Sequence, residues 1–376
     1  MKIAMVGTKG VPAQWGGIEK YIEEVGKRLV DNGHEVTVFG SKWFLTDFHG
    51  NEYCGMRIRR VPTLHHQATD ALSNAFFATL LVAIGRYDVV NFHGYASYFF
   101  IPLLKIFGKR TVVTIHAIES NWDNPKYHIL AKKVLQAGLK IGIYYAHSVT
   151  TVAEHLRDKL AKEYSVSATV LPSGIDIVKT QSPKIIRDMY GLHGFDYILF
   201  LGRIDQIKRI DWLLDLKKSL GNNLHIVIAG GAQDAATQLY LLTLIRTAGQ
   251  DKRIIFTGPV QGRLKAELLS NCLFFVNPSS NEGLPITVFE AISFGRCCLA
   301  SDIYAHREVI RHGYTGFLFP SDNKIAFLNL ARKLMIQPKE TLASMGDLAN
   351  KELKMRYNWE KTARGFDIIY RESILD

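Results

Sequence analysis

The chain has 376 residues, of which 47% are apolar and 22% charged, and a formal net charge of +11. This composition excludes a disordered or low-complexity protein, and the length suits two domains of roughly 150–200 residues each. The four cysteines show no CxxC spacing, which predicts reduced, buried thiols rather than a disulfide framework or a zinc cluster.

The positive charge is spread over both halves of the chain. Such an excess suits nucleic acid, an anionic membrane surface or a phosphorylated small molecule as a partner. No motif that reads DNA or RNA is visible, so we expect no nucleic-acid partner. The stretch MKIAMVG does not predict a signal peptide, and the uncharged run at 71–85 falls short of the ~20 residues of a membrane span. We expect a cytoplasmic protein in which 71–85 is a buried helix.

The first half of the chain alternates strand-like and helix-like segments. Residues 18–33 carry apolar side chains on one helical face, and Gly33 is expected to end this helix. Short apolar runs predict strands at 2–7, 34–40, 89–94, 110–117 and 148–153. This alternation is typical of a parallel sheet covered by helices.

The alternation starts again after 171–184, where Pro, Gly and Ser predict an interdomain linker. Further strands are predicted at 197–203, 224–231, 253–258, 272–279 and 297–301, and helices at 211–220 and 236–249. We therefore predict an α/β fold of two doubly wound, Rossmann-like domains, residues 1–178 and 179–359, that face each other across a cleft. Ligands of such sheets bind beyond the carboxyl ends of the strands.

Glycines follow the first predicted strand, at Gly7, Gly10, Gly16 and Gly17, and a helix opens directly behind them. Glycine lets backbone amides approach a ligand closely, and a helix N-terminus favours anions, so this loop is a candidate phosphate site. A plain flexible turn is the alternative. The spacing is not GxGxxG, which disfavours a dinucleotide-dependent dehydrogenase.

Two cations follow the strand predicted at 197–203, in the sequence GRIDQIKR. Arg203 and Lys208 are suited to neutralise a diphosphate, Arg203 through bidentate hydrogen bonds and Lys208 as a point charge. A solvated loop with no ligand is an equally supported interpretation of their position.

The stretch NPSSNEGLPITVFEAISFG places Glu282 just before a predicted helix and Glu290 inside it. Pro285 suits the first helical turn, and the amides of Gly283, Leu284 and the residues beyond Pro285 would then form an anion site. Two carboxylates beside a phosphate site suit a ligand with a sugar on each side of a diphosphate. A dipole-stabilising Glu282 and an ordinary surface Glu290 are the alternative.

These segments together resemble the retaining glycosyltransferases of the GT-B fold in family four, over nearly the whole chain. EGLPITVFEA is similar to the family's Glu-x7-Glu motif, LPSGID to its Pro-Asn-Gly-Val/Ile-Asp segment, and LGRIDQIKRID to its Gly-Arg-x4-Lys-Gly loop. Ser173 and Arg209 depart from this pattern, where the family has Asn and Gly. GTKGVPAQWGG is similar to a bacterial subgroup of rhamnosyl- and glucosyltransferases that build surface polysaccharides. A final helix, 360–376, resembles the family's helix that crosses back onto the first domain.

The resemblance implies roles for individual residues. Arg203 and Lys208 would bind the donor diphosphate, and Glu290 the donor ribose. The transferred sugar would be contacted by residues at the start of the Glu-x7-Glu motif: Glu282, Gly283, Leu284, Pro285 and Ile286. The base would lie near Gly258, Pro259 and Val260. The phosphate would be approached by Gly16 and Gly17. His116 matches a histidine near the reacting sugar, although a core histidine is a serious alternative. His93 has weaker support.

The implied reaction is transfer of a hexose from a nucleotide-diphosphate sugar (UDP, GDP or dTDP type) to a hydroxyl of a sugar or lipid-linked sugar, with retention at the anomeric carbon. The leaving diphosphate would help to deprotonate the acceptor. The chain has no Asp-x-Asp triplet, so we expect no obligatory metal and no cofactor.

Three rival functions stay open: a GT-B nucleotide-sugar epimerase, a dehydrogenase, and a non-catalytic sugar-nucleotide-binding protein. A peripheral contact with the inner face of the plasma membrane is a further hypothesis, because 95–110 and 126–145 mix aromatic, aliphatic and basic residues. A core-facing helix with a solvated basic side is at least as well supported for each segment.

Overall fold

The computed structural model describes residues 1–13, 16–46, 48–64, 69–118, 129–176, 178–219 and 224–375. The chain divides into two compact units, which are treated separately. Unit 1 comprises residues 1–174 and 357–376, and unit 2 comprises residues 175–356. The sequence predicted the boundaries at 178/179 and 359/360.

Unit 1 is built on a sheet whose described strands run in the order β3-β4-β2-β1-β5-β6-β7-β8. All neighbours pair in parallel except β3 and β4. The strands are β1 Lys2–Val6, β2 Glu35–Ser41, β3 Glu52–Tyr53, β4 Met56–Val61, β5 Val89–His93, β6 Arg110–Ile115, β7 Ser148–Thr151 and β8 Thr169–Val170. Most of β1 is apolar and fully buried, as expected of a strand covered on both faces.

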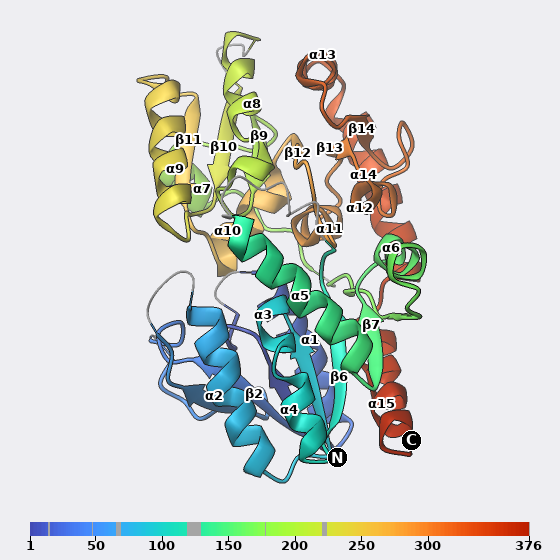
Figure 1. Cartoon of the computed structure of the whole chain (residues 1–376). Helices are drawn as coiled ribbons and strands as arrows, with labels where there is room; N and C mark the ends of the chain where they lie inside the picture. Colours follow the sequence, from blue (N-terminus) through green and yellow to red (C-terminus); the bar gives the residue numbers. More distant parts are fainter. Residues whose placement is uncertain are drawn as a thin grey trace. The chain divides into compact units, whose positions relative to one another are not determined.

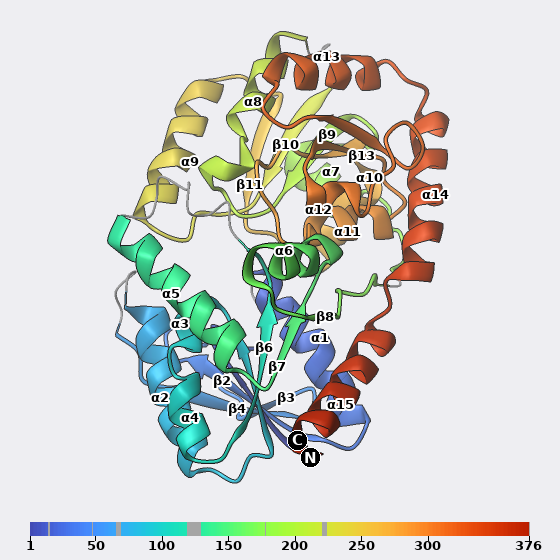
Figure 2. The same ribbon diagram turned by 45° about the vertical axis from the view of Figure 1, so that its right-hand side comes forward.

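Helices cover both faces of this sheet. The helices of unit 1 are α1 Gly17–Asp31, α2 Asp70–Ile84, α3 Tyr95–Tyr98, α4 Ile101–Ile106, α5 Ile129–Tyr145, α6 Glu154–Tyr164 and α15 Trp359–Leu375. Figure 2 shows α1 and α15 together on one side and α2, α4 and α5 on the other. Tyr21 of α1 meets Phe366 of α15 edge-on, at 6.1 Å between ring centroids, and the Asn91 amide donates to the Tyr370 hydroxyl at 2.8 Å.

Unit 2 contains a parallel sheet whose described strands run in the order β11-β10-β9-β12-β13-β14 (Figure 1). They are β9 Tyr197–Leu201, β10 His225–Ala229, β11 Ile254–Gly258, β12 Phe274–Asn277, β13 Cys298–Asp302 and β14 Phe317–Pro320. The helices are α7 Ile185–Tyr190, α8 Asp211–Leu214, α9 Ala235–Ala248, α10 Gly262–Asn271, α11 Ile286–Ser293, α12 Tyr304–Arg307, α13 Lys324–Met335 and α14 Lys339–Arg356, with 3₁₀ turns η2 Gln206–Lys208 and η3 Asp215–Ser219. Its core is aliphatic and aromatic, with Ile198, Phe200, Ile226, Phe274 and Val276 all buried.

Four local predictions were wrong. Of the four cysteines predicted to be buried, Cys54 is exposed. Helix α2 is not buried: small residues such as Ala75 and Ala78 face the sheet, while Phe76 and Leu80 are exposed. The described part of the segment predicted as a helix at 211–220 is a single turn of α-helix, Asp211–Leu214, followed by a 3₁₀ turn, Asp215–Ser219. Pro285 does not lie in the first turn of its helix, because α11 begins one residue later. None of the described helices is long and apolar enough to cross a membrane.

Candidate functional site

In unit 2 the strand order reverses between β9 and β12. From β9 the chain proceeds outward through β10 and β11, and it returns to β12 on the other side. This reversal is the topological switch point at which ligands of open α/β sheets bind. The loops that follow β9 and β12 flank this switch point. Hydrogen bonds join the two loops, because the Ile207 carbonyl accepts from the Ser280 amide at 2.8 Å and from the Ser280 hydroxyl at 3.2 Å.

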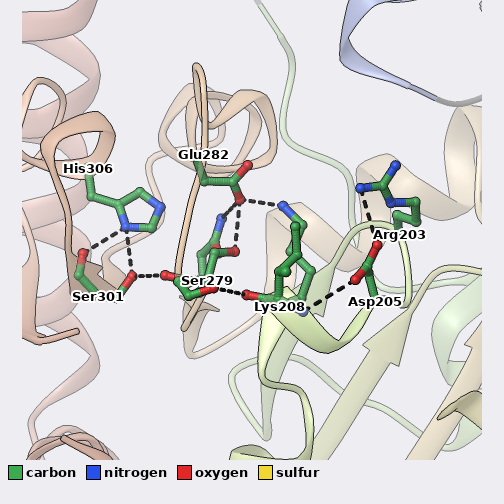
Figure 3. Close-up of polar contacts among 10 residues, drawn as sticks. Arg203, Asp205, Lys208, Ser279, Glu282, Ser301 and His306 are labelled. Atoms are coloured by element: carbon green, nitrogen blue, oxygen red, sulfur yellow. Dashed lines mark hydrogen bonds and ion pairs between the residues drawn. The ribbon is translucent and has the colours of Figure 1, made fainter. Parts of the chain in front are cut away.

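Glu282 is the centre of a polar network in the loop after β12 (Figure 3). One of its oxygens, Oε1, accepts from the Ser279 hydroxyl at 2.8 Å, from the Asn277 amide at 3.2 Å, and from the Lys208 ammonium group. Burial opposes ionisation of this carboxyl, but the charge of Lys208 and the hydrogen bonds hold its pKa below the ordinary value. Glu282 is therefore a largely buried carboxylate whose second oxygen is not used in this network.

Arg203 lies beside this network, and its side chain is 41% exposed. Its guanidinium lies 3.4 Å from a carboxylate oxygen of Asp205, which is buried and also accepts from the Ile207 amide at 3.3 Å. Asp205 thus shapes the turn that carries Lys208 and orients Arg203. The sequence prediction named the two cations but missed Asp205, although it stands between them in the motif.

His306 is a second residue that the sequence prediction missed. Its Nδ1 lies 2.7 Å from the Ser301 carbonyl, which can only accept, so Nδ1 carries the proton and Nε2 a lone pair. Burial lowers the pKa of His306 to about 4, so the ring is neutral at pH 7. The Ser301 hydroxyl donates to the Ser279 carbonyl, which links the histidine to the Glu282 loop. Ser301 lies near the carboxyl end of β13, the neighbour of β12, and His306 follows that strand on α12, a position that could have indicated the histidine.

Helix α11 presents backbone amides beside Glu282. Among the described residues, none accepts a hydrogen bond from the amides of Gly283, Leu284 and Thr287. The Ile286 amide is engaged, because it donates to the Leu284 carbonyl at 2.9 Å. Donors of this kind at a helix N-terminus favour an anion.

The other predicted donor-site residues of unit 2 lie around this centre. Glu290 sits on α11, and the Lys265 ammonium donates to it at 2.6 Å. Gly258 ends β11 with a positive φ of 71°, and Val260 follows in the loop before α10. Unit 2 therefore brings Lys208 and Glu282 into direct contact and joins Arg203 to the same loop through Asp205, whereas Glu290 is held separately by Lys265.

Unit 1 has its own switch point, between β1 and β5. A Cβ on Gly7, the residue after β1, would lie 1.9 Å from the His93 carbonyl oxygen, so only glycine fits where these strand ends meet. Gly16 has a φ of 111°, and a Cβ there would lie 2.2 Å from a Glu19 oxygen. Gly17 is the first residue of α1.

Glu19 fastens this glycine loop from the first turn of α1. It accepts from the Lys9 amide at 3.1 Å and from the Thr8 hydroxyl at 3.2 Å. Burial raises the pKa of Glu19 in spite of these hydrogen bonds. The sequence prediction missed this residue, which lies inside the predicted helix 18–33.

His116 and His93 form a hydrogen-bonded pair at the carboxyl ends of β6 and β5, with His93 buried and His116 partly buried. His93 Nδ1 and His116 Nε2 are 2.9 Å apart, and Tyr21 meets the His116 ring edge-on. Burial lowers the pKa of His116 to about 3, and it lowers the pKa of His93 well below its ordinary value. Because both rings are neutral, one nitrogen donates to the other, and the pair can hold His116 in a fixed orientation.

The two sets of residues offer different chemistry. Unit 2 provides two cations, helix amides and a carboxylate, a combination that can neutralise a phosphate and hydrogen-bond a hydroxyl. Unit 1 provides a glycine loop and a neutral histidine. The described residues contain no group of His, Cys, Asp and Glu side chains that could hold a metal ion.

Two family models match the chain, one in each half. Residues 15–179 match the model described as Glycosyltransferase Family 4, and residues 185–352 match Glycosyl transferases group 1. An uncharacterised glycosyltransferase of Methanocaldococcus jannaschii is 25% identical, over 99% of this chain and 98% of its own. The D-inositol 3-phosphate glycosyltransferase of Xylanimonas cellulosilytica is 23% identical, over 95% of this chain and 92% of its own.

Solved structures share the architecture over the same length. The Anabaena HepE protein in complex with UDP-glucose has a TM-score of 0.81 at 17% identity, with 99% of this chain and 100% of that chain covered. The sucrose-phosphate synthase of Thermosynechococcus elongatus has a TM-score of 0.83 at 18% identity, with 99% and 98% covered. These likenesses confirm the predicted α/β fold of the GT-B type.

Proposed function

We propose that the chain is a glycosyltransferase of the family-four type that uses a nucleotide sugar, and that it transfers a hexose to an acceptor hydroxyl with retention at the anomeric carbon; the two family models and the glycosyltransferase relatives support this proposal. The observation that carries this proposal is the Lys208–Glu282 ion pair, with Arg203 attached to the same loop through Asp205, beside the unengaged amides at and before the start of α11. It places positive charge and hydrogen-bond donors at the switch point of unit 2, where a diphosphate would develop negative charge as it leaves.

In the proposed reaction the bond between the anomeric carbon and the β-phosphate oxygen breaks, and a bond from the acceptor oxygen to that carbon forms on the same face. The acceptor proton passes to the leaving diphosphate. Arg203, Lys208 and the α11 amides would stabilise the diphosphate. Glu282 would orient a hydroxyl of the sugar with the carboxylate oxygen that its network leaves unused, and Glu290 would bind the ribose.

Glu282 and Glu290 are not suited to be the acid and nucleophile of a glycoside hydrolase, because each carboxylate is paired with a lysine, Lys208 and Lys265 respectively. The remaining steps are positioning and charge stabilisation, which need no metal. His116, held by His93, would contact the transferred sugar, and Gly16 and Gly17 would approach the phosphate. Gly258 and Val260 would lie by the base.

The donor proposed first is a UDP-sugar, because the Anabaena HepE structures contain UDP and UDP-glucose. GDP- and dTDP-sugars are the other candidates. A sugar or lipid-linked sugar of a bacterial surface polysaccharide is the proposed acceptor, supported by the resemblance to the rhamnosyl- and glucosyltransferase subgroup.

Thermal unfolding in the presence of UDP, GDP, dTDP, CMP and NAD tests the donor site. A ligand at ~100 times its Kd stabilises the folded chain by about 2.7 kcal/mol, which gives a measurable rise in Tm. We expect one nucleoside diphosphate to raise Tm. A rise with NAD alone would contradict the proposal, and conversion of the sugar nucleotide without any acceptor would favour the epimerase instead.

A further inference from the structure

Helix α2 of unit 1 exposes its large apolar side chains. Along this helix the small residues, among them Ala75, Ala78 and Ala83, pack inward. The exposed face carries Phe76, Phe77, Leu80, Leu81 and Ile84. Their spacing places them on one side of the helix. This is the reverse of an ordinary surface helix, whose large apolar residues turn toward the core, and exposed apolar patches of this kind mark interaction sites.

The apolar face continues beyond the C-terminal end of α2. The Lys109 ammonium donates to the Gly85 carbonyl at 2.6 Å, which brings the end of α4 to the end of α2. Ile84 at the end of α2 is 81% exposed, and Ile106 and Phe107 at the end of α4 are 82% and 52% exposed. We call Ile84, Ile106 and Phe107 the apolar tip. Figures 1 and 2 show α2 and α4 side by side.

Positive charge lies next to the apolar tip. Residues 85–110 contain four basic residues, Arg86, Lys105, Lys109 and Arg110, but one acidic residue, Asp88. Asp70 begins α2 at the end far from the tip, and Asp88 accepts from the Lys2 amide at 2.7 Å. Within the part of the chain that the structure describes, neither Arg86 nor Lys105, which flank the tip, forms an ion pair.

We propose that the apolar tip and the cations around it bind the surface of an anionic lipid bilayer. The apolar side chains would enter the boundary between headgroups and acyl chains, while the basic side chains pair with lipid phosphates. Helix α2, at 15 residues, is too short to span a bilayer and is suited to lie on one. An acidic protein would satisfy the cations, but it would not by itself explain isolated, highly exposed apolar side chains at the ends of two helices.

This proposal extends the membrane contact predicted from the sequence and moves it to different residues. The sequence placed the contact on 95–110 and 126–145. Ile106 and Phe107 belong to the first segment, residues 126–128 of the second lie outside the described residues, and α2 was not included. The proposal does not depend on the reaction, so failure of either leaves the other open to its own test.

Vesicle flotation with the full chain tests the proposal. The vesicles are made of phosphatidylcholine alone or of phosphatidylcholine with 30 mol% phosphatidylglycerol, at low and at high salt. We expect binding to the anionic vesicles only, with loss at high salt. Ile84→Gln, Ile106→Gln and Phe107→Gln combined should weaken binding about tenfold or more, because three apolar insertions are lost. Arg86→Gln with Lys105→Gln should weaken it roughly 25-fold, since each cation near the surface contributes about fivefold.

A matched control comes from unit 2, where Ile325 and Ile336 are also exposed, at 72% and 83%. Ile325→Gln with Ile336→Gln should leave vesicle binding unchanged, and an unchanged Tm shows that each variant is folded. The proposal is overturned if the native chain does not float, if it floats equally with neutral vesicles, or if the tip variant binds as well as the native chain. Light scattering that finds a dimer broken by the tip substitutions, without vesicle binding, would assign the tip to a second copy instead.

Discussion

Lys208 and Glu282 are both largely buried, and each side chain stabilises the charged form of the other. Removing one partner of such a pair usually costs more than the pair contributes, because the remaining charge is left without compensation. Glu282 has further support from Ser279 and Asn277, whereas Lys208 depends on the carboxylate. A bound diphosphate would offer Lys208 a second negative partner, so the ion pair keeps this cation at the proposed phosphate site.

The proposed role of Glu282 predicts a kinetic signature for Glu282→Gln. The amide keeps the shape of the side chain but removes the charge that orients the transferred sugar. We expect kcat to fall about 10²-fold or more, the range measured for other preorganised polar groups, while the Kd for the nucleoside diphosphate changes by less than about tenfold. Steady-state kinetics and calorimetric titration measure the two quantities. An unchanged kcat would remove Glu282 from the site.

His306 predicts a pH dependence of stability. In the folded chain its pKa is about 4, against 6.5 ordinarily, because of burial. Between these values the unfolded chain binds a proton that the folded chain does not, so stability is fully present above pH 6.5 and is lost as the pH falls toward 4. The loss is roughly 3 kcal/mol from this residue.

Urea unfolding at intervals between pH 7 and pH 4 measures this effect, with His306→Gln as the comparison. The glutamine does not titrate, so the free energy of unfolding of this variant should fall less steeply over the window than that of the native chain. His225→Gln is a suitable control, because His225 is only partly buried. Equal slopes for His306→Gln and the native chain would contradict the assignment.

At the scale of elements, the turn that carries Lys208 ends at Arg209, where the related family has glycine. Arg209 adopts a left-handed conformation with a φ of 48°, which costs a non-glycine residue about 1 kcal/mol or more. Its side chain compensates, because it donates to Ser321 and Asp322 and stacks on the Trp212 ring at 4.8 Å. This turn is therefore held by side-chain contacts rather than by a glycine.

Two substitutions at this turn separate the backbone from the side chain. Arg209→Ala removes the side-chain contacts and retains the energetic cost of a left-handed backbone for a residue with a Cβ atom. Arg209→Gly removes the same contacts and also removes that cost. We expect both variants to be less stable than the native chain, with Ala lower than Gly by about 1 kcal/mol. Chemical denaturation gives the two free energies. A glycine variant less stable than the alanine variant would show that the left-handed backbone carries no strain.

The sequence predicted most strands of both sheets, since fully buried parallel strands are short apolar runs bounded by turn residues. The prediction that α2 is buried was wrong, because a continuous apolar run does not reveal which face of the helix meets the core. In the folded chain the face with the small side chains packs against the sheet. The sequence singled out Arg203, Lys208 and Glu282 because motif residues follow strand ends, and their role as a donor site stays a prediction. It missed His306 and Glu19, whose importance depends on contacts between different loops that only the folded chain makes.

At the scale of the whole molecule, the two units differ in how the chain builds them. Unit 2 is one continuous segment, 175–356, whereas unit 1 recruits α15 from the far end of the chain. Helix α15 contributes buried side chains at Trp359, Phe366 and Tyr370, and the Thr362 hydroxyl donates to the Pro172 carbonyl at 2.6 Å. Unit 1 should therefore depend on α15 for stability, and unit 2 should not.

Separate expression of the segments tests this difference. We expect 175–356 to unfold cooperatively on its own, because its sheet and core are complete. We expect 1–174 to be unstable, because truncating even one buried aromatic residue typically costs 3–5 kcal/mol and α15 supplies three. A peptide of residues 357–376 added in trans should restore cooperative unfolding and shift the Trp359 fluorescence to the blue. The same peptide with Phe366→Ala and Tyr370→Ala should restore it much less. The expectation would be wrong if the 1–174 segment unfolded cooperatively by itself and its stability did not change when the native peptide was added. In that case the sheet and the helices on its other face would be sufficient for folding without α15.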